Sequence, residues 1–211
     1  MARYEIAPTK TNLLKLKQEF SFAEEGYQLL DQKRSILIVE LMRIIDTAKR
    51  LELDMEENLK KAFSSLQMAA QTNGRRNLNL IANTIGITHN ISISQRKVMG
   101  VPLPIVNVSY RENPPYFSLT DTSFWVDEAI QNFKETLKII GELAQTRISL
   151  IRLAREVSKT IRKVNALEKI AIPDYKETIK YIEERIEEAE RESFFLMKLV
   201  KKRLEKKKGN N

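Results

Sequence analysis

A seven-residue repeat of apolar side chains is the strongest constraint on the fold of this chain. It begins at Leu13 and continues to about residue 72, and fourteen of its eighteen a and d positions are apolar. Gly and Pro, which interrupt helices, together supply only 12 of the 211 residues. A repeat sustained beyond three or four heptads indicates a coiled coil. The spacing predicts a very long helix within residues 1–85, with Asn73-Gly74 as a point where it ends or loosens.

A second repeat follows the cap-rich segment 118–123, and Asp127 and Glu128 stand in its first turn, where the helix dipole favours acids. Sixteen of its twenty-two a and d positions are apolar, and its register continues across Pro173, where we expect a kink. Its predicted core positions are Ile130, Phe133, Leu137, Ile140, Ala144, Arg147, Ile151, Ala154, Ser158, Ile161, Asn165, Glu168, Ile172, Tyr175, Ile179, Ile182, Ile186, Ala189, Ser193, Leu196, Val200 and Arg203.

Two helices of about 75 and 85 residues each exceed 100 Å at about 1.5 Å per residue, and neither can leave an apolar stripe bare in water. The simplest solution is an all-α fold: a long antiparallel two-helix coiled coil. It would comprise residues 1–85, a connecting segment 86–120 and residues 121–211, all in one elongated domain. Counting from the connection places Lys10 level with Phe194. The second helix should then overshoot by about three turns.

The register also places Leu41 level with Val164, and the overshooting end of the second helix should be the basic segment 201–208.

The connecting segment contains KVMGVPLPIVNVSY, residues 97–110, in which Val106 to Tyr110 alternate as in a strand. We predict a small β-hairpin with its turn between about Val98 and Pro104. Pro104 should weaken pairing at the sheet edge and discourage addition of another strand. Because a bare loop would reverse the chain equally well, the hairpin suggests a surface with a further role.

Composition limits the class of protein without choosing a partner. The net charge of +8, from 36 basic and 28 acidic residues, permits nucleic acid, an anionic membrane or an acidic protein. Cys is absent, which fits a reducing cytosol. No apolar run follows Met1 as in a signal peptide, and none approaches the roughly 20 residues that span a bilayer.

The sequence offers no reactive constellation. His89 is the only histidine, and no phosphate-binding loop motif is present. The acidic run 183–192 is interspersed with Arg185 and Arg191, which favours a solvated helix face over a metal site. We therefore expect no catalytic, cofactor-binding or metal-ligating residues.

Residues 36–45 are apolar on nearly all faces, although a two-helix coil buries only one seam. One interpretation is a locally thick core, helped by self-association. The other is a collar gripped laterally by another protein. The candidate collar residues are Ile36, Ile38, Val39, Met42, Ile45, Arg155, Arg162 and Asn165.

Four segments in this order resemble the D subunit of V-type and A-type ATPases, the central rotor stalk, and the resemblance covers essentially the whole chain. They are Pro8-Thr-Lys-Thr-Asn-Leu-Leu-Lys-Leu-Lys17, Leu29-Leu-Asp-Gln-Lys-Arg34, Gly100-Val-Pro-Leu-Pro104, and Arg162-Lys-Val-Asn-Ala-Leu-Glu168 with Ile172-Pro173. The resemblance implies a non-catalytic subunit that transmits torque between the catalytic head and the membrane rotor, coupling ATP synthesis or hydrolysis to proton or sodium transport.

The resemblance also implies partners and a location. The partners would be the catalytic and regulatory head subunits (A and B), the small F subunit of the stalk, and a funnel-shaped socket subunit (C/d type) on the membrane rotor. The protein would be cytoplasmic and peripheral to the membrane as part of the ATPase complex. Residues proposed to meet the head are Lys10, Lys15, Lys17, Lys198, Lys201, Lys202 and Arg203.

An alternative function is a basic coiled-coil protein that binds nucleic acid or anionic lipid through its C-terminal tail. Binding of that kind should fall steeply with salt. For the tail itself, the simpler interpretation is a solvated segment kept basic for solubility.

Overall fold

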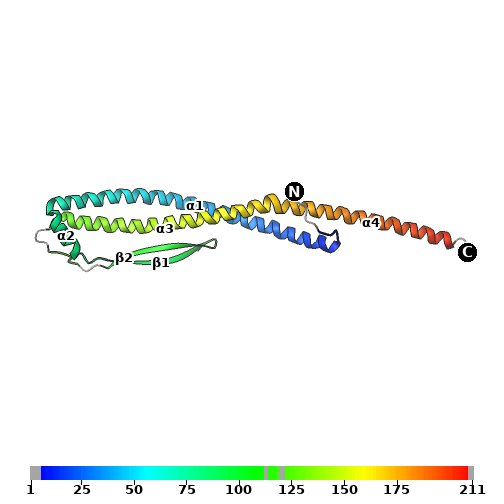
Figure 1. Cartoon of the computed structure of the whole chain (residues 1–211), viewed down its shortest axis with the longest axis horizontal. Coiled ribbons are helices and arrows are strands. Elements are labelled where there is room, and N and C mark those ends of the chain that lie inside the picture. The colour runs from blue at the N-terminus through cyan, green and yellow to red at the C-terminus, as the bar shows by residue number, and fades with distance from the viewer. Residues whose placement is uncertain (1–5, 112–113, 119–121, 209–211) are drawn as a thin grey trace. The chain divides into compact units, whose positions relative to one another are not determined.

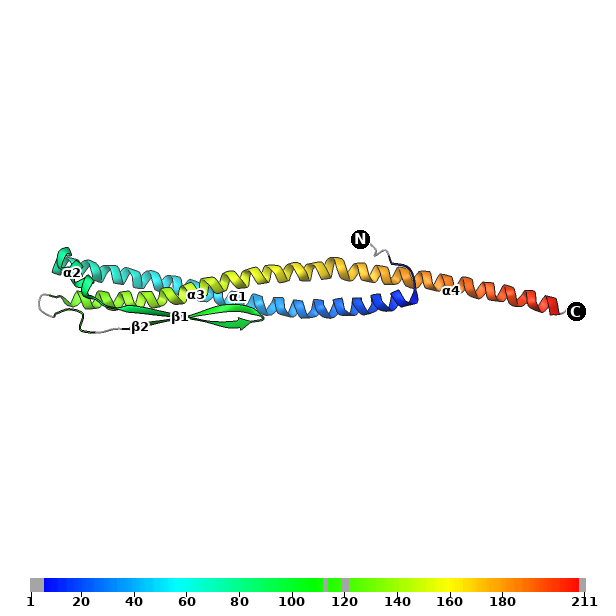
Figure 2. The same cartoon turned by 60° about the horizontal axis from the view of Figure 1, so that its bottom comes forward.

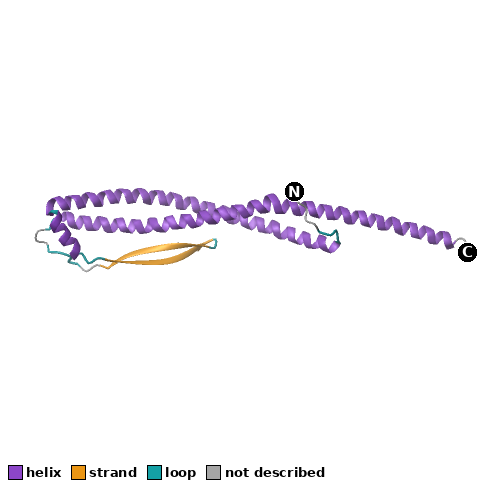
Figure 3. Cartoon of the chain, viewed as in Figure 1, coloured by secondary structure: helices purple, strands orange, loops and turns teal. Residues whose placement is uncertain are grey.

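The computed structural model describes residues 6–111, 114–118 and 122–208, without the side chains of His89 and residues 204–208. It is helical apart from one two-stranded antiparallel sheet (Figures 1 and 3), which confirms the predicted all-α fold with a small hairpin. The elements are α1 (Lys10–Asn73), α2 (Arg75–Thr84), β1 (Thr88–Val98), β2 (Val101–Arg111), α3 (Phe124–Ala166), the π-helix η1 (Leu167–Ala171) and α4 (Ile172–Lys208).

Two compact units make up the chain. The first contains residues 1–35 and 159–211, and the second contains residues 36–158. Helix α1 contributes residues to both units. The predicted pairing of Leu41 with Val164 would join the two units, and it remains a prediction.

In the first unit, ion pairs define how α1 meets α4. Lys10 Nζ lies 2.6 Å from Glu190 Oε1, and Lys17 Nζ lies 2.6 Å from Glu183 Oε1. Seven residues forward on α1 therefore correspond to seven residues back on α4, as an antiparallel pair requires. Lys10 was predicted to lie level with Phe194, so the observed alignment differs by one helical turn. The part of α4 beyond Glu190 has no α1 residues level with it.

In the second unit, α1 pairs with α3 in the same antiparallel sense. The Arg147 guanidinium is 2.8 Å from Glu52 Oε1, and Asn132 Nδ2 donates to Ser65 Oγ at 3.1 Å. Leu37 of α1 and Leu153 of α3 are fully buried in this unit.

The predicted core register is right for α1 and wrong for α3. On α1 the d positions of the repeat that begins at Leu13 include Leu16, Leu37 and Ile44, and these three residues are buried. On α3 the buried positions lie one residue before many of the predicted ones, and Ile151 is 49% exposed while Leu153 is 0% exposed. The buried residues of α3 are Val126, Ala129, Thr136, Leu143, Thr146, Ser149, Leu153, Val157, Thr160 and Val164.

Threonine explains that error. Thr136 and Thr146 are buried, and each hydroxyl donates to the carbonyl four residues earlier, at 2.7 Å. A hydroxyl satisfied within its own helix can enter the core at small cost. A count of apolar positions treats such a threonine as polar and chooses the neighbouring register.

Pro173 does not end the helix, because α3, η1 and α4 follow one another without a gap. A π-helix, η1, lies directly before the proline-containing turn, and the kink expected at Pro173 remains a prediction. Proline lacks an N–H and its ring crowds the carbonyl four residues earlier. A wider π turn accommodates that carbonyl.

The hairpin is longer than the sequence suggested. Its strands pair from Thr88 with Arg111 to Val98 with Val101, and only Met99 and Gly100 lie between them. Both turn residues have positive φ, 47° and 82°, as two-residue hairpin turns of the I′ type require. The turn lies within the predicted range, and both strands lie within the predicted connecting segment 86–120.

Candidate protein interaction surfaces

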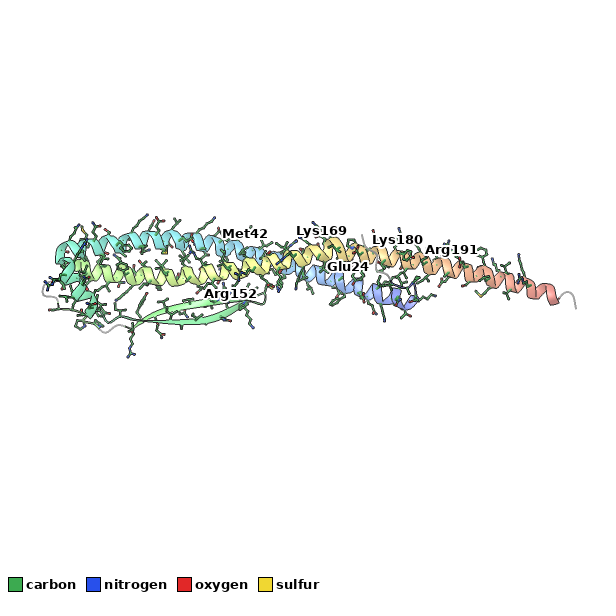
Figure 4. All side chains as sticks on the ribbon, viewed as in Figure 1. Glu24, Met42, Arg152, Lys169, Lys180 and Arg191 are labelled. Atoms are coloured by element: carbon green, nitrogen blue, oxygen red, sulfur yellow. The ribbon has the colours of Figure 1, made fainter. Side chains whose placement is uncertain are left out.

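Strand β2 is seated on α3 by hydrogen bonds to its backbone. The Val106 N–H donates to Gln145 Oε1 at 2.7 Å, and the Arg152 guanidinium donates to the Pro102 carbonyl at 2.8 Å. Both views of the cartoon place the hairpin alongside α3 (Figures 1 and 2), and Arg152 lies on the hairpin side of that helix (Figure 4). These two contacts fix the position of the hairpin along the axis of α3.

Gly141 allows the close approach of β2 to α3. A Cβ atom on residue 141 would stand 2.6 Å from Val108 Cγ2 and 3.9 Å from Val106 Cγ1. Real Cβ atoms do not tolerate the shorter distance, so any residue other than glycine at this position would force Val108 of β2 to move. Sequence analysis missed this role. A lone glycine inside a strong helical repeat is the signal that could have indicated it.

The two ends of the hairpin have further contacts with the helices. Arg96 near the turn lies 3.4 Å from Glu40 of α1, and Glu40 also has a longer contact with Arg43 at 4.0 Å. At the base, the Tyr110 hydroxyl donates to the Lys134 carbonyl at 2.8 Å. Burial raises the pKa of Tyr110, and the positive charge of Lys134 opposes this rise in part.

An apolar cavity of about 330 Å³ lies at the base of the hairpin. Helix α2, which begins after Gly74 at φ 75°, contributes Leu78 and Ile81 to the lining on one side, and Ile85 follows directly after the helix. Phe133, whose ring meets Phe63 edge-on at 5.6 Å between centroids, lines the other side. The cavity is part of the packing between α2, β2 and α3.

The predicted collar residues belong to both units. In the second unit Val39 is 69% and Met42 63% exposed, whereas Ile38 and Ile45 are half-buried. The remaining collar residues are Ile36 (44% exposed), Arg155 (exposed), Arg162 (exposed) and Asn165 (half-buried). The exposed apolar part of the collar is therefore Ile36, Val39 and Met42, all on α1.

The predicted head-contacting residues near the start of α1 include two lysines in ion pairs. Lys10 and Lys17 pair with glutamates of α4, and the hydrogen bond to Glu190 raises the pKa of Lys10. Lys198 lies 4.8 Å from the centroid of the Phe194 ring. The other predicted residues, Lys15, Lys201, Lys202 and Arg203, are exposed.

The last turns of α4 carry a bare apolar surface that sequence analysis assigned only to seam positions. All described side chains from Glu187 to Arg203 are exposed. The apolar ones are Phe194, Phe195, Leu196, Met197, Leu199 and Val200, exposed by 55–66%. Six apolar residues among the seven from 194 to 200 cover every face of this helical segment, and this apolar stretch was the available signal. Beyond Arg203, the side chains of the basic tail lie outside the described part of the chain.

Within the described residues, no group of three or more His, Asp or Glu side chains could hold a metal ion. The helices of the described part also include none that is long and apolar enough to cross a membrane.

Paired helices, a hairpin seated on one of them and bare apolar surfaces define a helical protein built for contacts with other proteins. Comparison with known proteins makes the assignment specific, because the model of the ATP synthase D subunit family matches residues 12–202. The chain is 38% identical over 205 residues to the D subunit of the A-type ATP synthase of Thermococcus sibiricus, covering 96% of both chains. The identity to the D subunit of the V-type ATP synthase of Thermotoga neapolitana is 35% over 199 residues, covering 94% and 98% of the two chains. This chain belongs to the ATP synthase D subunit family.

Proposed function

We propose that this protein is the central rotor subunit of a V/A-type ATPase or ATP synthase. It would transmit torque between the catalytic head and the membrane rotor and would itself catalyse no reaction. Its partners would be the A and B subunits of the head, the small F subunit of the stalk, and the funnel-shaped socket subunit of the membrane rotor. It would act in the cytoplasm, peripheral to the membrane.

The observation that carries this proposal is the bare end of α4. Single-helix turns with six apolar side chains exposed by 55–66% are unfavourable in water and call for a covering partner. Lys198, Lys201, Lys202 and Arg203 add positive charge to the same turns. This combination suits a bearing inside the head, where apolar contacts centre the helix and the charges meet acidic side chains weakly enough to release them.

A rotor element must also resist bending and twisting. Helix α1 is unbroken over 64 residues, and α3, η1 and α4 continue without a gap. Ion pairs on the solvated faces, such as Lys17 with Glu183 and Arg147 with Glu52, hold the paired helices in register. These features support a stiff two-helix element in each unit.

Reversal of charge at the bare end tests the head contact. The variant K198E/K201E/K202E, incorporated into the assembled complex, should lower ATP hydrolysis coupled to ion transport and lower the torque in single-molecule rotation. The single variants Lys202→Glu and Lys180→Glu give a matched comparison, since both lysines are exposed on α4 and only Lys202 is at the bare end. Unchanged turnover and torque in the triple variant would refute the head contact.

The lateral partner is proposed to bind the exposed collar residues of α1. Val39→Asp and Met42→Asp place a charge where an apolar partner surface would desolvate it, so each should weaken binding of the F subunit by about tenfold or more. Leu53→Asp is the control, because Leu53 is 63% exposed on the same helix and outside the collar. Equal losses for all three variants would remove the collar from the proposal.

A further inference from the structure

The two edges of the hairpin differ in what covers them. Gln145 and Arg152 of α3 bond to backbone groups on the outer edge of β2, at Val106 and Pro102. Pro102 and Pro104 have no N–H to offer on that edge. In the described part of the chain, β1 pairs only with β2, so its own outer edge has no neighbouring strand. The hairpin therefore has one covered edge and one open edge.

Register identifies the backbone groups on the open edge. The Val106 N–H points to α3, so Val106 and its partner Ile93 form a non-hydrogen-bonded pair, in which both residues direct their backbone groups away from each other. Alternate residues of β1 share that direction. The backbone N–H and C=O groups that face outward from β1 are therefore those of Ile91, Ile93, Gln95 and Lys97.

Proline does not protect this edge. The sequence suggested that Pro104 would discourage strand addition, but the structure places Pro104 on the covered strand, where it is buried. Strand β1 contains no proline, and every described side chain from Asn90 to Lys97 is exposed. Ile91 and Ile93 are 59% and 69% exposed. An open edge with exposed isoleucines is a template for another strand.

The positive charge around the hairpin favours a particular kind of partner strand. From Asn58 to Arg111 the chain has no Asp or Glu and has seven basic residues, so this stretch carries +7 of the net charge of +8. Its basic residues are Lys60, Lys61, Arg75, Arg76, Arg96, Lys97 and Arg111. Arg96 already pairs with Glu40 of α1 and Lys60 with Glu56, while Lys97 on β1 is exposed. A partner with acidic side chains would neutralise this excess.

We propose that the outer edge of β1 is a docking site for an extended, acidic segment of another protein, which adds as a third strand. Its backbone would pair with the outward groups of Ile91, Ile93, Gln95 and Lys97, its apolar side chains would cover the two isoleucines, and its carboxylates would meet Lys97. A nucleic acid backbone fits less well, because phosphates only accept hydrogen bonds and would leave the outward carbonyls of β1 unpaired.

The test uses the full chain and two blocked peptides of about eight residues, one alternating Glu with Val and the other alternating Lys with Val. We expect the acidic peptide to bind at least about tenfold more tightly than the basic one. It should slow amide exchange at residues 91, 93, 95 and 97, and its affinity should fall as salt rises. Equal binding of the two peptides, or protection elsewhere, would overturn the proposal.

Two variants separate edge pairing from general charge. Ile93→Pro removes an outward N–H without removing a bond to β2, as Pro104 already does on the other strand, and it should abolish binding. Retained protection of the Asn107 amide, which the register directs toward Ser92 of β1, verifies that the hairpin persists. Lys97→Glu should weaken binding several-fold, whereas Lys61→Glu, on an exposed site of α1, should not. If Ile93→Pro binds as tightly as the unmodified chain, strand addition is excluded.

Two other occupants give different results in the same assays. If a single-stranded oligonucleotide protected the same amides, the occupant of this edge would be a nucleic acid and not an acidic protein segment. A concentration-dependent dimer that Ile93→Pro dissolves would replace it with a second copy of the chain. The peptide assay needs no other subunit, so its failure would leave the proposed rotor function standing.

Discussion

Val108 of the hairpin lies so close to Gly141 of α3 that a Cβ at position 141 would stand 2.6 Å from its Cγ2 atom. The hydrogen bond between the Val106 N–H and Gln145, one helical turn further on, holds the strand at the same place. These contacts hold β2 at one defined position against α3. Because β2 is the strand that contacts α3, its outer edge is covered and the outer edge of β1 is open.

Gly141→Ala should displace the hairpin while leaving the helices folded. Overpacking costs about 1–3 kcal/mol, which exceeds the roughly 1 kcal/mol that alanine gains over glycine in a helix. The measurement is amide hydrogen exchange at residues 101–111, which should accelerate, with helix content followed by circular dichroism. Gly26→Ala is the control, because a Cβ there meets nothing within 4 Å, and it should stabilise the chain slightly. Unchanged amide exchange in Gly141→Ala would contradict the conclusion that Gly141 is needed for β2 to pack on α3.

Leu153→Ala and Ile151→Ala test the corrected core register of α3. Leu153 is fully buried, so its truncation should lower the free energy of unfolding by about 2–5 kcal/mol. Ile151 is 49% exposed and should cost about 1 kcal/mol or less. Chemical denaturation followed by circular dichroism gives both values. A larger loss at Ile151 would restore the register predicted from the apolar repeat.

Tyr110 should make stability fall at alkaline pH. Burial raises its pKa above the ordinary value of 10.0, so the folded state holds the phenol proton more tightly than the unfolded state does. This contribution is fully present below the unfolded pKa and is lost as pH rises through the folded pKa. Thermal unfolding between pH 9 and 11 should therefore show a steeper decline for the native chain than for Tyr110→Phe. If the two proteins lost stability equally between pH 9 and 11, the raised pKa of Tyr110 in the folded state would be contradicted.

Removal of the bare end of α4 should separate stability from function. A chain ending at Arg191 loses only turns whose described side chains are exposed, so its free energy of unfolding should change by about 0.5 kcal/mol or less. Urea unfolding checks this, and Lys10 with Glu190 remains intact. The assembled complex should nevertheless lose coupling. A markedly destabilised chain would instead indicate that these turns fold against the rest of the first unit.

Much of this architecture could be predicted because it depends on the local periodicity of apolar residues. The repeat from Leu13 fixed the first helix and its buried face at Leu16, Leu37 and Ile44. Antiparallel pairing followed from two stripes that each need cover, and it was placed within one turn in the first unit. The candidate collar could be located by its apolar run, but the sequence could not say which of its residues are exposed.

By itself, the sequence determined the helices, the reversal of the chain through a hairpin, and the family. Those features depend on spacing along the chain, which local rules read directly. Only the tertiary structure decided the register of α3, the seat of Val108 over Gly141, and which edge of the hairpin is open. The physical reason is that each depends on contacts between segments distant in sequence. The positions of a buried threonine, a lone glycine or a proline along the chain do not say which residue or which strand lies against them.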